Sequence, residues 1–218
     1  MRRRRLSLRL PPLVLALVLL SAPARAAESN RDREESRLLA VLASAAPLAE
    51  RESAVVRLHR FGSGRAVSEL AKLLSDAELS HAARHALEPM PFASAGRALA
   101  EALTTTAGPV RLGLISSLAS RREMTAVPAL APLLRDAADV AAAEAAAHAL
   151  GMMPDASALA VLEAAWPETT GSVRAAVLDA LLAQAWRLLR RHRGPHRRGP
   201  QRARVDAWFD RARAAAAG

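Results

Sequence analysis

The sequence predicts an all-α protein, an α-solenoid of about five antiparallel helix–turn–helix repeats. Of its 218 residues, 53 are alanine and 34 are leucine, and both residue types favour helix. Three tryptophans, three phenylalanines and no tyrosine are too few aromatic side chains for a typical β-sandwich or barrel. Similar segments recur about every 31 residues, which is typical of a repeat protein.

The repeat is clearest in the second helix that we expect in each unit. Four segments align, and their final leucines are 31, 32 and 31 residues apart. The aligned segments are 79–87, 110–118, 142–150 and 173–181. The positions four and eight residues before each final leucine are apolar and share one helical face. One hairpin cannot bury such a face, so neighbouring units must stack. Gly151 follows the third segment and predicts a helix end there.

A first helix is expected before each of these segments. The expected first helices cover 66–75, 94–104, 126–135 and 157–166. A weaker pair at 37–45 and 50–61 is irregular, as a capping repeat would be. The solenoid is therefore expected to extend over residues 27–186.

Turn residues between the helices support this division. Ser75 and Glu78 have the spacing of a capping box before a second helix. Pro109 is placed where the first turn of a helix tolerates proline, with Thr105 or Thr106 as its cap.

Two patterns in the later units resemble a known repeat family. Residues 126–137 read "AVPAL..LL.D", while 136–152 and 171–183 read "V(R)..A...AL(G)". These units resemble short bacterial HEAT-like repeats over roughly residues 37–186, including those of exported proteins. The resemblance implies a rigid binding or scaffold module. Related repeats occur in phycobilisome-lyase-like proteins, but only the packing pattern is shared, and the chain has no cysteine.

The first 26 residues have the three parts of a secretory signal peptide. Five arginines lie before residue 10, an apolar stretch covers 10–20, and Ala24 and Ala26 form a small-x-small cleavage site. Eleven apolar residues are too few for a helix that spans about 30 Å of hydrocarbon. We therefore expect cleavage before Ala27 and export to the periplasm or the extracellular space.

The last segment, 187–218, is an Arg/Pro-rich tail that we expect to be largely disordered. Val205, Trp208, Phe209 and Ala212 are nevertheless spaced as one helical face, which predicts a short helix near 203–216. Such a helix either docks on the solenoid or lies on an anionic membrane.

The net charge of +10 suggests a nucleic-acid partner until the charges are located. The expected signal peptide holds six arginines, and the tail holds ten arginines against two aspartates. Residues 27–186 have fifteen basic and nineteen acidic residues, a net charge of −4. No nucleic-acid partner is therefore expected, and membrane contact is expected only through the tail.

The motifs of common catalytic sites are missing from the sequence. There is no GxSxG, HExxH, GxxxxGK[ST] or GxGxxG pattern, and a chain without cysteine excludes thiolate sites. His81 and His85 have an i, i+4 spacing that suits a divalent metal, but a third ligand is not evident. No catalytic residue, cofactor or metal is expected.

Polar residues align across the units on a face next to the apolar one. We expect eight of them to form a polar stripe that is either a solvated face or a binding ridge. Its members are His81, His85, Arg111, Ser116, Glu144, His148, Arg174 and Asp179. Their mixed charges suit a protein partner better than a polyanion.

The sequence therefore favours a non-catalytic, exported repeat scaffold that mediates protein–protein interaction. One alternative is an accessory module or fragment of a larger exported enzyme. Another is binding to a polyanion or membrane surface through the basic tail, which would weaken steeply with salt.

Overall fold

The computed structural model describes residues 12–191, 203, 206–210 and 214. Every regular element in these residues is a helix, and none of them is a strand. No helix among them has the length and apolar character needed to cross a membrane. The all-α prediction is confirmed.

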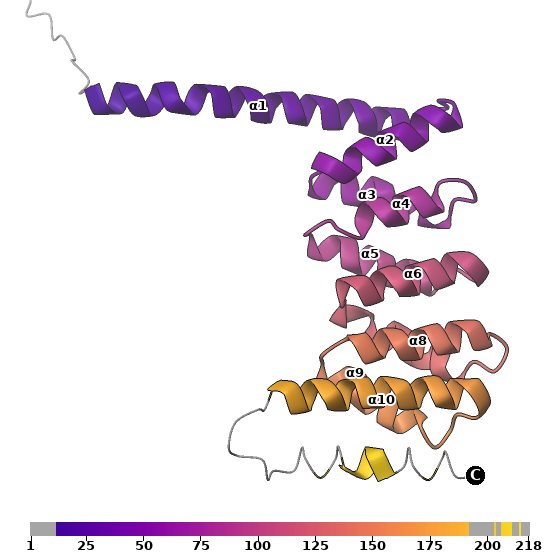
Figure 1. Cartoon of the computed structure of the whole chain (residues 1–218). Coiled ribbons are helices and arrows are strands. Elements are labelled where there is room, and N and C mark those ends of the chain that lie inside the picture. The colour runs from indigo at the N-terminus through magenta and orange to yellow at the C-terminus, as the bar shows by residue number, and fades with distance from the viewer. Residues whose placement is uncertain (1–11, 192–202, 204–205, 211–213, 215–218) are drawn as a thin grey trace, which may run out of the picture.

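The helices form five successive pairs that stack along one axis (Figure 1). The pairs are α1 (Pro12–Ala43) with α2 (Leu48–Phe61); α3 (Gly64–Lys72) and η1 (Leu73–Ser75) with α4 (Ser80–Leu87); α5 (Ala93–Leu103) with α6 (Gly108–Arg121); η2 (Met124–Ala126), α7 (Val127–Leu130) and η3 (Ala131–Arg135) with α8 (Val140–Met152); and α9 (Ala156–Ala165) with α10 (Gly171–Arg191). The second helices α2, α4, α6, α8 and α10 contact one another in that order. The predicted α-solenoid of five units is confirmed.

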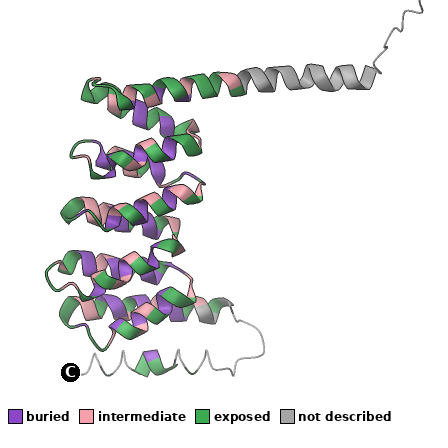
Figure 2. Cartoon of the chain, turned by 180° about the vertical axis from the view of Figure 1, so that it is seen from behind, coloured by how far each residue is buried: buried purple, intermediate pink, exposed green. Residues whose placement is uncertain are grey.

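The core lies where the sequence pattern predicts it. The final leucines of the four aligned segments, Leu87, Leu118, Leu150 and Leu181, are at most 1% exposed. The residues four positions earlier in each segment are 0% exposed. Figure 2 shows the buried residues on the sides of the helices that face their neighbours. Each unit therefore completes the core of the next, as stacked repeats require.

Prolines explain why the first helix of the fourth unit is broken. Pro128 occupies the first turn of α7, where its missing N–H removes no helical hydrogen bond. Pro132 lies inside the same run, and the chain changes there from α-helix to the 3₁₀ segment η3. Proline cannot donate the backbone hydrogen bond that a regular helix would need at this position.

Two of the predicted helix caps are wrong. Asp76, rather than Ser75, binds the backbone just before α4. Its Oδ1 accepts hydrogen bonds from the backbone N–H of Glu78 and Leu79, both at 2.9 Å. These bonds hold the pKa of Asp76 below its ordinary value. Pro109 lies in the first turn of α6 as predicted, but the N-cap there is Ala107, which offers no side-chain cap.

The threonines that we expected to cap the start of α6 instead bind the end of the preceding helix, α5. The hydroxyls of Thr105 and Thr106 donate to the carbonyl of Ala102, at 3.3 and 2.9 Å. A hydroxyl that reaches back to a carbonyl three or four residues earlier satisfies the end of a helix.

The helix end predicted at Gly151 is correct to within one residue, since α8 ends at Met152, but Gly151 itself is not the stop residue. It is buried inside α8, which runs on to Met152. A Cβ atom at Gly151 would lie 2.8 Å from the Cβ and 2.9 Å from the Cα of Ala180 in α10. The missing side chain therefore allows α8 and α10 to touch.

Gly151→Ala is expected to lower the free energy of unfolding by about 1–2 kcal/mol, because overpacking between two helices outweighs the gain in helix propensity. Chemical denaturation measures the change. The control is Gly64→Ala at the start of α3, where an added Cβ meets nothing within 4 Å, so that its effect is neutral or stabilising. A stabilising effect at Gly151 would contradict the close approach.

The described part of the tail contains one helical stretch, 206–210. Trp208 is 1% exposed and belongs to the hydrophobic core, whereas Phe209 is 39% exposed. Val205 and Ala212 lie outside the described residues. Helix α10 extends to Arg191, five residues past the expected end of the solenoid.

Candidate binding surface

Four residues of the predicted stripe occupy the same position in successive units. His85, Ser116, His148 and Asp179 each precede the final leucine of the unit by two residues, and all four are exposed. They lie on α4, α6, α8 and α10, which stack in this order. We call these four residues the polar row.

The other four members of the stripe are less available. His81 is exposed, while Arg111, Glu144 and Arg174 are half-buried. Arg111 donates from Nε to the carbonyl of Thr106 at 2.7 Å and from Nη1 to Asp139 at 3.2 Å. The guanidinium of Arg174 lies 5.2 Å from the ring centroid of Trp166, within the range of a cation–π contact. These two arginines therefore make contacts within the fold, and their charges are not free to bind a partner.

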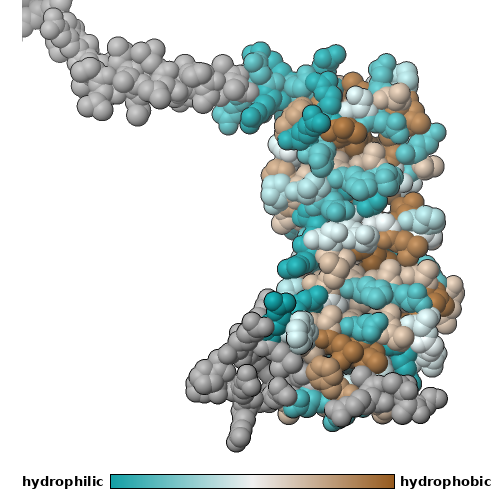
Figure 3. Space-filling view, viewed as in Figure 1, coloured by the Kyte–Doolittle hydropathy of each residue, from teal (hydrophilic) through white to brown (hydrophobic). Residues whose placement is uncertain are grey.

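The described part of the face formed by the second helices mixes hydrophilic and apolar side chains. In the space-filling view, hydrophilic and apolar side chains alternate along its coloured part (Figure 3). Large apolar patches are the usual mark of obligate interfaces. A mixed face of this kind suits a partner that binds reversibly through polar contacts.

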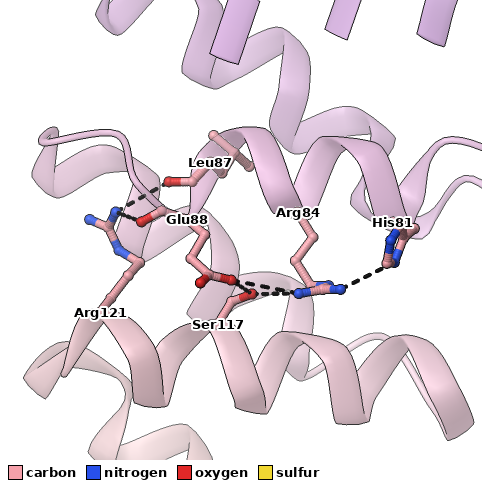
Figure 4. A network of polar contacts seen from close by, with 6 residues as sticks. All are labelled: His81, Arg84, Leu87, Glu88, Ser117 and Arg121. Carbon is pink, nitrogen blue, oxygen red and sulfur yellow. Dashed lines mark hydrogen bonds and ion pairs between the residues drawn. The ribbon is translucent and has the colours of Figure 1, made fainter. Parts of the chain in front are cut away.

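A polar network that the sequence analysis missed joins α4 to α6 (Figure 4). Arg84 donates from Nη1 to the hydroxyl of Ser117 at 2.8 Å, and this hydroxyl donates to Oε2 of Glu88 at 2.6 Å. Nη2 of Arg84 lies 3.2 Å from Nδ1 of His81. A Cβ at Gly113 would lie 2.8 Å from Nε of Arg84, so this glycine leaves the space that the guanidinium fills.

Arg121 closes the end of α4 from the next unit. Its Nη1 donates to the carbonyls of Leu87, Glu88 and Met90 at 3.2, 2.6 and 2.7 Å. Its Nη2 reaches the carbonyl of Phe92 at 3.3 Å. The last carbonyls of a helix lack partners within the helix, and one half-buried guanidinium binds carbonyls at the end of α4 and in the loop that follows it.

The register position of Arg121 holds apolar and polar residues in alternation along the solenoid. It lies three residues after each final leucine and holds Met90, Arg121, Met153 and Gln184 in turn. Gln184 donates from Nε2 to the carbonyl of Leu150 at 2.9 Å and also to that of Met153. The two methionines are 3% and 0% exposed.

Local backbone geometry explains why the end of α6 needs no donor from the next unit. Helix α6 ends at Arg121, its C-cap Arg122 has a φ of 52°, and the N–H of Glu123 returns to the carbonyl of Leu118 at 3.0 Å. This left-handed ending satisfies the carbonyls of α6 from within the chain. Helices α4 and α8 end without such a residue, and the next unit binds their carbonyls. Helix α2 also ends without one, at Gly62, but there the side chain of Met90 packs against the helix end.

Part of this repeating structure matches a known repeat family. Residues 96–182 match the family model described as HEAT repeats. The match begins in α5 and ends in α10, so it includes three of the four residues of the polar row. No curated protein matches the chain closely enough to count as a relative. Domains made of HEAT repeats typically serve as scaffolds that bind proteins.

Histidines gather just before the segment that matches HEAT repeats. The rings of His81 and His85 lie edge to face, with their centroids 4.5 Å apart. Within the described part of the chain, no three histidine, aspartate or glutamate side chains come together as metal ligands would. The pKa of His85 is lowered from its ordinary 6.5, first by partial burial and then by the charges of Arg84 and His81, while Glu88 acts against this shift.

His85 is expected to titrate below pH 6.5, as followed by NMR of its ring. Because the unfolded chain binds this proton more readily, the imidazole reduces the stability of the fold as the pH falls from 6.5 toward the folded-state pKa. Replacing Arg84 by methionine removes one of the opposing charges and moves the midpoint upward. A midpoint at or above 6.5 in the unmodified chain contradicts this arrangement.

Proposed function

We propose that the chain is a non-catalytic, exported scaffold that binds another protein along the face of its second helices. The observation that carries the proposal is the polar row, in which one register position stays exposed and polar on four successive helices. HEAT repeats commonly bind proteins, and solenoids bind along continuous surfaces of this kind.

The chemistry of the polar row supports a protein partner. Packed helices lie roughly 8–10 Å apart, so four neighbours span about 30 Å. The row offers two imidazoles, one hydroxyl and one carboxylate, which can donate and accept hydrogen bonds along this length. A polyanion would favour a row of one charge sign, whereas residues 27–186 have a net charge of −4.

The test compares two variants that each change exposed residues only. In the row variant, His85, Ser116, His148 and Asp179 become alanine. In the control variant, Ser68, Arg97 and Glu101 on the first helices become alanine. A protein captured by the unmodified chain from the exported fraction is expected to bind the row variant at least about tenfold more weakly, and to bind the control variant unchanged. Equal binding of both variants overturns the proposal.

Export is the second part of the proposal, and the packing of α1 is compatible with it. The buried side chains described on this helix, Glu35, Leu38 and Leu42, all follow the expected cleavage point before Ala27. Glu35 accepts from both the backbone N–H and the hydroxyl of Ser63, each at 2.7 Å. Cleavage at Ala27 would leave these contacts intact.

N-terminal sequencing of the secreted chain tests this part directly. The expected first residue is Ala27, because the site before it has small residues at both required positions. A chain that stays in the cell and begins at Met1 overturns the export proposal without affecting the polar row.

A further inference from the structure

A cavity of about 220 Å³ lies between the N-terminal halves of α4 and α6. Its volume exceeds the ~150 Å³ that suffices for benzene and is below the roughly 300–1,000 Å³ of pockets that hold drug-sized ligands. One wall is apolar and is formed by Leu74, Pro109, Val110 and Leu114. This wall suits a small aliphatic group.

The cavity is also lined by hydrogen-bond donors. Ser80, His81 and Arg84 line it. Because Nδ1 of His81 accepts from Arg84, the neutral ring carries its proton on Nε2, which is then a donor. Ser80 adds a hydroxyl, and among the described residues no atom accepts from Nε of Arg84. The cavity therefore favours a ligand that is rich in acceptors.

The local charge is also suited to an anion. Figure 4 shows the guanidinium of Arg84 between His81 on one side and Ser117 with Glu88 on the other. Glu88 does not line the cavity, and its carboxylate is 3.6 Å from Nη1. Nε of Arg84, which lies beside Gly113 in the lining, thus keeps an N–H that a carboxylate can use in a charge-assisted pair.

We propose that this cavity binds a carboxylate joined to a branched aliphatic chain. Two sources share this chemistry: a free small acid, and the C-terminal residue of a polypeptide that ends in an aliphatic side chain. The site does not depend on the proposed protein partner, because none of the four residues of the polar row lines the cavity.

The test titrates the full chain with 4-methylpentanoate and with the matched neutral amide, 4-methylpentanamide, by isothermal calorimetry and by amide NMR. The acid is expected to bind with a Kd of roughly 1–20 mM, as suits a ligand of eight non-hydrogen atoms. The amide is expected to bind about tenfold more weakly, since it loses the charge-assisted pair. Shift changes are expected at the amides of residues 80–84 and 110–114.

Two variants change the cavity from opposite sides. Val110→Phe fills the apolar part from α6 and is expected to weaken binding of the acid at least about tenfold. Arg84→Met removes the cation and is expected to weaken the acid about tenfold while leaving the amide unchanged. Circular dichroism verifies that each variant is folded, and Val110→Phe keeps the test decisive if Arg84→Met unfolds.

The matched controls are Val140→Phe, at an exposed position on α8, and Arg97→Met, at an exposed position on α5. Both are expected to bind the acid as the unmodified chain does. The peptide Ala-Ala-Leu, with a free or an amidated end, separates the two sources: tighter binding of the free-ended peptide than of the acid assigns the polypeptide source, and the reverse assigns the small acid. Equal binding of acid and amide, shift changes elsewhere, or no binding at about 50 mM overturns the proposal.

Discussion

Replacing Trp208 by alanine is expected to lower the free energy of unfolding by about 3–5 kcal/mol. The side chain is 1% exposed and belongs to the hydrophobic core, although it follows the last helix of the repeat array by many residues. A solenoid exposes an apolar end wherever its last unit lacks a neighbour. Trp208 accordingly acts as part of a C-terminal cap, and its loss leaves a cavity as well as exposed core surface.

Denaturant unfolding of Trp208→Ala and of Phe209→Ala tests this capping role. Phe209 is the neighbouring aromatic residue and is 39% exposed, so its replacement is expected to cost far less. Similar small effects at both positions would show that the tail leaves the end of the core uncovered.

Replacing Arg121 by methionine is expected to lower the free energy of unfolding by roughly 2–4 kcal/mol. Methionine fills much of the same space but donates no hydrogen bond, so the carbonyls at the end of α4 lose their partner. The change also removes the cation that lies 3.6 Å from the carboxylate of Glu123. This carboxylate occupies the space that a Cβ on Gly96 would need, so it is held close to α5.

Arg122→Met provides the matched control for Arg121→Met. Arg122 is adjacent in sequence but exposed, and most exposed substitutions change stability by less than about 0.5 kcal/mol. Thermal or chemical unfolding of the two variants should separate them clearly. Equal stability of the two variants would mean that water satisfies the carbonyls of α4 as well as Arg121 does.

The sequence pattern predicted the stacking of the units because the apolar positions repeat at a fixed spacing. Leu118 and its counterparts are buried where that spacing places them. The exposure of the polar row was predictable by the same means, since one register position on equivalent helices meets an equivalent environment. What the spacing leaves open is which exposed residues bind a partner.

Local signals were less reliable because one residue type serves several purposes. A buried glycine such as Gly151 looks the same in sequence whether it ends a helix or allows a close approach. Thr105 and Thr106 can bond forward to an N–H or backward to a carbonyl, and the choice depends on where α5 ends. In each case the three-dimensional neighbour, rather than the local sequence, decides the role.

The polar contacts between units were missed for a different reason. Arg84 and Ser117 are 33 residues apart, as are Arg121 and Glu88, so no local pattern connects them. A signal was present in the alignment itself, because Arg121 and Gln184 share one register position. A charged or amide side chain at a position that elsewhere holds buried methionine indicates a specific hydrogen-bond partner within the fold.

Met90, Arg121, Met153 and Gln184 alternate between methionine and donor along the chain. This alternation affects how many repeat units can be inserted or deleted together. The two methionines are 63 residues apart, and so are the two donors. Deleting a single unit would place a methionine at a helix end that now binds a donor, or a donor at a helix end that now meets methionine. Deleting or duplicating two units together preserves this pairing of methionines and donors. At this position the module that can be exchanged is thus a double repeat.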